Sequence, residues 1–197
     1  MFLFLIRLFI KFLVIFFIKV DFSLLFVLQF KKDLDMEVES GMINYDLVER
    51  LKELGLTISC AESCTGGLVA KTITDVGGCS EVFSGGVVSY SNEVKMNVLG
   101  VSADTLKNYG AVSESTAKEM AYGVRRVCGT DIGISTTGIA GPGGGTKDKP
   151  VGTVYVGFSY KDTTEAFKLA LSPTMSRDEI RHTAVAKILE YALHKIS

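Results

Sequence analysis

Residues 56–76, LTISCAESCTGGLVAKTITDV, combine a strand-like segment, a short polar turn and a helix-like segment. Residues 56–62 have the composition of a short strand, and we expect a helix to begin between Ser63 and Thr65 and to continue to Val76. A strand followed directly by a helix is a building unit of α/β proteins. The stretch therefore predicts an α/β fold, and it gathers several hydroxyl and thiol side chains at the turn.

The rest of the chain continues this alternation of strands and helices. Residues 44–54 predict an amphipathic helix with Asn44 as its cap and Gly55 as its end. The later segments are a strand (82–91), two short helices (92–100 and 102–110, the second capped by Ser102), a long helix between Ser113 and Gly129, a strand (131–141), a hairpin (151–160 and 163–172) and a final helix with a capping box at Ser176 and Glu179. This order predicts an α/β domain with a mixed, mostly parallel sheet.

The first 35 residues differ in composition from the rest of the chain. Nine of the twelve Phe residues lie in the first thirty positions, and four charged residues interrupt the apolar run. A transmembrane helix needs about 20 largely apolar residues, and the small residues of a signal-peptide cleavage site are nearly absent. We interpret residues 1–35 as the product of a start assigned upstream of the true one, with a membrane-associated leader as the alternative. The working domain is then residues 36–197, and we expect it in the cytoplasm.

Charge and cysteine usage argue against several classes of function. From Met36 onward the chain has 16 basic and 19 acidic residues without a basic stripe, so we expect no nucleic-acid partner. Cys60, Cys64, Cys79 and Cys128 form neither a CxxC pair nor a zinc-type spacing. We therefore expect free thiols and no metal site.

Ser63 stands where the first strand gives way to a helix. At such a position, unpaired N–H groups and the helix dipole favour a negatively charged oxygen, which suits a nucleophilic serine or an oxyanion. Gly66 and Gly67 let a ligand approach the backbone closely. The alternative is that Ser63 or Thr65 merely caps the helix. Cys64 would be the nucleophile only if the pKa of its thiol were lowered.

A serine nucleophile needs a base, and histidine and lysine are the candidates. His182 and His194 are twelve residues apart on the final helix and do not share a face. Lys95 follows Tyr90 by five residues and lies near a helix start, where the dipole and burial would both lower its pKa. A solvated lysine at a capped helix start is the alternative. The S-x-x-K pattern at 115–118 lacks its companion motifs, so we interpret it as a surface pair.

Four stretches resemble the CinA C-terminal domain family in their order and spacing. They are AESCTGG (61–67), VSYSNEVKMNVLGV (88–101), GAVSE (110–114) and GIAGPGGGTKDKPVGTV (138–154). The resemblance covers about residues 42–196 and implies a three-layer α/β/α domain. It also implies an amidase that converts nicotinamide mononucleotide to nicotinate mononucleotide and ammonia without a metal or other cofactor. Larger family members carry a separate N-terminal domain of molybdopterin-binding type, whose function we do not transfer to this chain.

The same resemblance implies roles for individual residues. Ser63 is the expected nucleophile, Tyr90 its partner and Lys95 the base. Our own mechanistic hypothesis adds that backbone N–H groups near Thr65 and Gly66 hold the oxyanion. The expected substrate contacts are Gly138, Ala140 and Gly141 as a wall of the pocket, and Arg177 and Arg181 at the phosphate. One alternative is a non-catalytic module that binds a partner in DNA uptake or repair, and another is a serine amidase for a different amide. The amphipathic helices favour a homo-oligomer.

Overall fold

The computed structural model describes residues 43–197, so the predictions for residues 1–35 and for a domain start at Met36 lie outside the described residues. A five-stranded sheet forms the centre, in the order β2-β1-β3-β4-β5. The strands are β1 (Ile58–Glu62), β2 (Phe83–Val88), β3 (Ile132–Gly138), β4 (Thr153–Tyr160) and β5 (Thr163–Ala170). β1 pairs in parallel with β2 and β3, whereas β4 and β5 add an antiparallel hairpin. The predicted α/β fold with a mixed sheet is confirmed.

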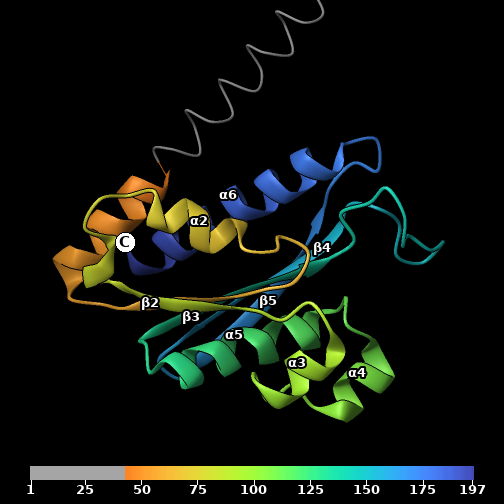
Figure 1. Ribbon diagram of the computed structural model, residues 1–197, viewed down its shortest axis with the longest axis horizontal. Coiled ribbons are helices and arrows are strands. Elements are labelled where there is room, and N and C mark those ends of the chain that lie inside the picture. Colours follow the sequence, from red (N-terminus) through yellow and green to blue (C-terminus); the bar gives the residue numbers. More distant parts are fainter. Residues whose placement is uncertain (1–42) are drawn as a thin grey trace, which may run out of the picture. The chain divides into compact units, whose positions relative to one another are not determined.

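Helices cover both faces of this sheet (Figure 1). One face carries a helix over residues 43–54, α2 (Leu68–Thr74) and α6 (Arg177–Ile196), and the other carries α3 (Asn92–Asn97), α4 (Ala103–Tyr109) and α5 (Glu114–Cys128). A short 3-10 helix, Cys79–Glu81, precedes β2. The described residues therefore form the three layers that the family resemblance implies.

Each face of the sheet has its own apolar core. Side chains alternate between the two faces along a strand. Ile58 and Cys60 of β1 accordingly join the cluster packed under α6, whereas Ala61 joins Met120 and Val124 of α5 on the other face. β1 is buried at every position as a result. The residue after β1 is thus held by packing on both sides of the sheet.

The predicted signals at the later helix ends are confirmed. Ser102 caps α4, Ser113 caps α5, and Gly129 ends α5 in a left-handed conformation. Ser176 and Glu179 form both hydrogen bonds of the capping box at the start of α6. Each of these signals acts within one helical turn, so local sequence is sufficient to predict it.

The predicted starts of the first two helices are wrong. Asn44 already lies inside the helix over residues 43–54, and its side-chain amide donates to the Thr72 carbonyl of α2 at 2.6 Å. α2 begins at Leu68 rather than between Ser63 and Thr65, and its N-cap residue, Gly67, has no side-chain cap. At α2, backbone N–H groups around the helix start bond to the Glu62 carboxylate instead of to a Ser63 or Thr65 side chain.

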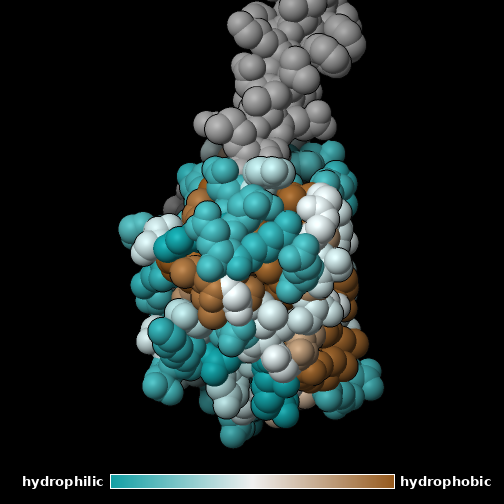
Figure 2. Space-filling model, turned by 90° about the vertical axis from the view of Figure 1, so that its left-hand side faces the viewer, coloured by the Kyte–Doolittle hydropathy of each residue, from teal (hydrophilic) through white to brown (hydrophobic). Residues whose placement is uncertain are grey.

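The face of the molecule in Figure 2 is mostly hydrophilic, with smaller apolar areas between the polar side chains. α5 and α6 bury apolar side chains against the sheet.

Within residues 43–197, no helix has the length and apolar character needed to cross a membrane. The homo-oligomer expected from the amphipathic helices stays a prediction.

Candidate active site

The candidate site lies at the edge of the sheet where the parallel strands end. Ser63 directly follows β1, Ser89 directly follows β2, and Gly138 ends β3. Backbone hydrogen bonds hold this edge together, because Ser63 N donates to Thr136 O at 3.0 Å and Ser89 N donates to Glu62 O at 2.7 Å. In open α/β sheets, ligands bind outside the carboxyl ends of the strands.

Lys95 reaches Ser63 at this edge although 32 positions separate them. Its Nζ atom donates to Ser63 Oγ at 3.1 Å and to the Ser89 carbonyl oxygen at 2.6 Å. The residue is only 1% exposed. Burial lowers the pKa of Lys95 from its ordinary 10.5, while Cys64 acts in the opposite direction. Among the described residues, no carboxylate forms an ion pair with Lys95 that would restore its charge.

The reason for the lowered pKa differs from the one expected. Ser91 caps α3, and α3 is so short that Lys95 falls in its last turn, where the helix dipole favours a cation. The predicted contribution of the helix start is therefore wrong, and burial is the cause. The alternative of a solvated lysine is also wrong, because the side chain is buried.

The thiols of Cys60 and Cys64 are protonated at neutral pH. Burial raises the pKa of Cys64 to about 12, although Lys95 and Arg177 both act to lower it. Burial, followed by the charge of Glu62, raises the pKa of Cys60 well above its ordinary value. Since the thiolate is the reactive form of cysteine, Ser63 is the better candidate nucleophile.

Glu62 is the residue of this region that sequence reasoning missed. Its side chain is 1% exposed, and its carboxylate oxygens accept hydrogen bonds from the backbone N–H groups of Gly67, Val69 and Ala70 at 2.9–3.0 Å. Glu62 therefore caps α2, and Ser63 is free of that role. An acidic residue at the end of a strand, just before a Gly-Gly helix start, was the available signal.

Substitution Glu62→Gln is expected to lower the free energy of unfolding by about 2–3 kcal/mol. A hydrogen bond to a charged group contributes about 1.5–3 kcal/mol, and the glutamine amide offers one acceptor where the carboxylate offers two. Urea unfolding measures the change. Glu81→Gln, at an exposed position, is the matched control and should change stability by less than about 0.5 kcal/mol. Equal changes in the free energy of unfolding for the two substitutions would show that the hydrogen bonds of Glu62 to α2 do not stabilise the fold measurably.

The turn after Ser63 presents backbone donors rather than side chains. Thr65 is buried, and its hydroxyl lies 2.6 Å from the Thr136 hydroxyl, so it is not available to a substrate. Gly66 has a left-handed φ of 58°. Across the part of the chain that the structure describes, the N–H groups of Thr65 and Gly66 donate to no protein acceptor. Two such donors near a nucleophile are what an oxyanion requires.

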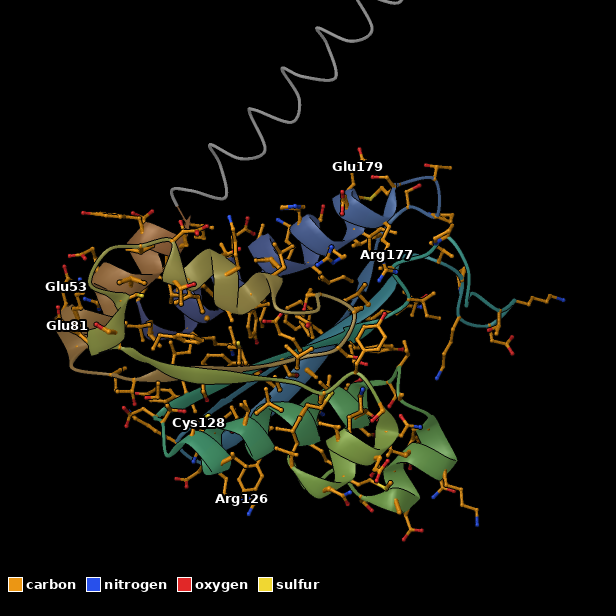
Figure 3. The ribbon with its side chains drawn as sticks, viewed as in Figure 1. Glu53, Glu81, Arg126, Cys128, Arg177 and Glu179 are labelled. Atoms are coloured by element: carbon orange, nitrogen blue, oxygen red, sulfur yellow. The ribbon has the colours of Figure 1, made fainter. Side chains whose placement is uncertain are left out.

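Tyr90 belongs to a second group of residues at the rim of the site. It is 65% exposed, and its hydroxyl forms no hydrogen bond with Ser63 or Lys95 within residues 43–197. Arg177 donates to the Tyr90 hydroxyl at 3.4 Å and to the Gly141 carbonyl at 2.7 Å. Figure 3 shows Arg177 at the start of α6, at the end of the sheet away from Cys128.

The remaining residues expected at the substrate lie mainly in packed positions. A Cβ atom at Gly138 would lie 2.7 Å from Thr153 O, so this glycine permits close strand packing. Ala140 is buried in the apolar core. Arg181 donates to the Thr65 carbonyl. The structure thus joins Ser63 to Lys95 directly and places Arg177 and Gly141 together at the rim.

Other sequence candidates do not reach this site. Lys118 forms an ion pair with Glu114 at 2.8 Å, which confirms the interpretation of the S-x-x-K pattern as a surface pair. Neither His182 nor His194 forms a hydrogen bond with Ser63 in the described range. No group of three His, Cys, Asp or Glu residues within 43–197 could hold a metal ion.

Fold and site together define an α/β domain with a buried lysine against a serine at the carboxyl ends of its parallel strands. Residues 42–196 match the family described as the CinA C-terminal domain, and the chain belongs to this family.

Relatives with similar sequences are named as competence-damage inducible or CinA-like proteins. A "putative competence-damage inducible protein" from Thermoanaerobacter sp. (strain X514) is 56% identical over 144 residues, which are 73% of this chain and 34% of that protein. A "CinA-like protein" from Kosmotoga olearia is 52% identical over 145 residues, 74% of this chain and 35% of that protein. The chain thus spans about a third of the length of these relatives.

Solved structures of related proteins have the same fold. The competence/damage inducible protein CihA from Agrobacterium tumefaciens superposes with a TM-score of 0.76 at 37% identity, covering 79% of this chain and 96% of that one. A CinA superfamily protein from Escherichia coli superposes with a TM-score of 0.72 at 31% identity, covering 75% and 85% of the two chains.

Proposed function

We propose that this domain is a serine amidase that hydrolyses nicotinamide mononucleotide to nicotinate mononucleotide and ammonia. The observation that carries the proposal is the 3.1 Å separation between Ser63 Oγ and the Nζ atom of a buried lysine with a lowered pKa. A lowered pKa makes the neutral form of the lysine more accessible, and a neutral lysine is able to act as a base. The choice of substrate rests on the family resemblance of the four motifs, and we take the catalytic domain to begin near Met36.

The first step activates Ser63. One N–H of neutral Lys95 donates to the Ser89 carbonyl, which leaves the lone pair of Nζ available for the Ser63 hydroxyl proton. As the proton moves to Nζ, Oγ forms a bond to the carboxamide carbon, and the carbonyl oxygen becomes an oxyanion. The backbone N–H groups of Thr65 and Gly66 stabilise that charge without rearrangement, because no protein acceptor in the described residues occupies them.

The second half of the reaction returns the enzyme to its starting state. The Lys95 ammonium gives its proton to the amide nitrogen, the C–N bond breaks and ammonia leaves. Neutral Lys95 then takes a proton from water, the resulting hydroxide attacks the acyl carbon, and nicotinate mononucleotide leaves as Ser63 Oγ recovers its proton from Lys95. Arg177, exposed beside Tyr90 and Gly141, is the proposed contact for the substrate phosphate.

The test is incubation of the full chain with nicotinamide mononucleotide, with ammonia and nicotinate mononucleotide quantified separately. Equal amounts of both products would support the proposal. If the chain hydrolyses another carboxamide and not the nucleotide, the proposal of a serine amidase stands but its substrate is a different amide. Folded protein that releases ammonia from neither would favour the alternative of a non-catalytic partner-binding module.

The rate is expected to rise with pH through the lowered pKa of Lys95. The base must be neutral, so kcat/KM should increase as Lys95 loses its proton and level off above that pKa, which lies below 10.5 because of burial. A profile of kcat/KM between pH 5 and pH 10 measures this limb. A rate that falls with rising pH over the same range would contradict Lys95 as the base.

A further inference from the structure

Arg181, on α6, holds the turn that connects Ser63 to α2. Its Nη2 and Nε atoms both donate to the Thr65 carbonyl oxygen, at 2.7 and 3.3 Å, across 116 positions of sequence. Its Nη1 atom lies 3.5 Å from the Asp178 carboxylate one turn earlier on α6. All three guanidinium nitrogens therefore have protein partners, and the side chain is only 25% exposed.

The carbonyl that Arg181 binds shares a peptide bond with the Gly66 N–H. The only cis peptide bond within the described residues is Gly141-Pro142, so the Thr65–Gly66 peptide is trans. In a trans peptide the C=O and N–H point in opposite directions. The Gly66 N–H therefore points away from the guanidinium, and it donates to no protein acceptor in the described part of the chain.

Two physical effects follow for that N–H group. The two hydrogen bonds from Arg181, together with one from Leu68 N to the same carbonyl at 3.2 Å, hold the peptide plane at a left-handed glycine, where the backbone has more conformational freedom than elsewhere. A cationic donor on the carbonyl also polarises the peptide, and linked hydrogen bonds strengthen one another by roughly 10–30%. Both effects improve the Gly66 N–H as a donor to a negative oxygen.

We infer that Arg181 is a positioning residue that orients and polarises the Gly66 N–H toward the oxyanion, and that it does not bind the substrate phosphate. The inference rests on the proposed function. It separates the two arginines of α6, because Arg177 is exposed at the rim whereas Arg181 is bound to the nucleophile turn and to Asp178.

The decisive measurement is the rate at which Ser63 reacts with a fluorophosphonate probe. In that reaction Oγ forms a bond to phosphorus, fluoride leaves, the serine proton passes to Lys95, and the P=O oxygen takes the oxyanion position. Arg181→Met should slow labelling about 10- to 100-fold, somewhat less than the 10²–10³-fold loss of a whole oxyanion donor. Arg181→Lys keeps a positive charge but not the contact through two nitrogens. Its labelling rate should lie between the rates of the wild-type chain and Arg181→Met. Arg126→Met, on α5 at the other face of the sheet (Figure 3), is the control and should label normally.

Steady-state kinetics on two substrates separate positioning from phosphate binding. For Arg181→Met, kcat should fall by a similar factor with nicotinamide mononucleotide and with nicotinamide riboside, which lacks the phosphate, and KM should change less than about threefold. A raised KM for the nucleotide alone would assign Arg181 to the phosphate and overturn the inference. If Arg181→Met unfolds at lower urea concentration but is labelled at the wild-type rate, Arg181 is only a structural contact, and the inference is overturned as well.

Failure of the proposed function gives a different pattern from failure of this inference. If the wild-type chain is labelled at Ser63 but does not hydrolyse the nucleotide, the substrate is wrong, and the labelling rates of the Arg181 variants still decide the inference. If the wild-type chain is not labelled at all, Ser63 is not an activated nucleophile and both proposals are rejected.

Discussion

Ser63→Ala is expected to abolish ammonia release from nicotinamide mononucleotide, with a loss in kcat of about 10⁶-fold. The substitution removes the hydroxyl oxygen that lies 3.1 Å from Lys95 Nζ, so no acyl-enzyme can form. The measurement is ammonia release over hours at high enzyme concentration, with mass spectrometry of the wild-type protein to detect an acyl adduct on Ser63. We expect the fold to be unchanged, because Ser63 contributes no cap to α2.

Cys64→Ala is the matched control for this experiment. The Cys64 thiol is adjacent to Ser63, but burial raises its pKa to about 12, so it is protonated at neutral pH. We expect the control to keep activity within about tenfold of the wild-type chain. If Cys64→Ala lost activity and Ser63→Ala retained it, the nucleophile would be the Cys64 thiol and not the Ser63 hydroxyl.

Lys95→Met is expected to lower kcat by about 10⁴-fold or more, since a general base contributes 10²–10⁴-fold and the pair acts as a unit. Methionine keeps much of the length and apolar surface of the side chain but accepts no proton. The double variant Ser63→Ala, Lys95→Met should be no slower than Ser63→Ala alone, because neither group works without the other.

Lys118→Met serves as the control for removal of a lysine. Lys118 lies on the surface of α5 in an ion pair with Glu114, and its loss should leave turnover unchanged. Near-normal turnover in Lys95→Met would contradict the role of Lys95 as the base. Multiplied losses in the double variant would show that Ser63 and Lys95 act independently.

The buried Lys95 also links stability to pH. In the unfolded chain its pKa is near 10.5, and burial lowers the pKa in the folded chain. Between these two values the unfolded state binds more protons, so the free energy of unfolding should rise with pH. In Lys95→Met this rise is lost, and urea unfolding of both proteins between pH 6 and pH 10 isolates the difference. The base therefore lowers stability at the pH where the enzyme works, as active-site groups often do.

The fold was predictable wherever the signals are local. The capping box at Ser176 and Glu179, the cap at Ser113 and the hairpin of β4 and β5 each depend on residues close in sequence. The two wrong helix starts involve hydrogen bonds that span more than one helical turn. Asn44 bonds to Thr72, and Glu62 reaches over the turn to the start of α2, so the pattern near each start was a poor guide.

The sequence by itself determined the elements, the motifs and the candidates Ser63 and Lys95, because hydrophobic periodicity, caps and the family motifs are properties of neighbouring residues. It left open whether Lys95 was buried or solvated, and which residue capped α2. Only the tertiary structure decided that Lys95 is buried against Ser63 and that Arg181 is bound to the turn after it. The physical reason is that desolvation and long-range hydrogen bonds depend on which segments pack together, and strand order brings β1 and β2 side by side at this edge.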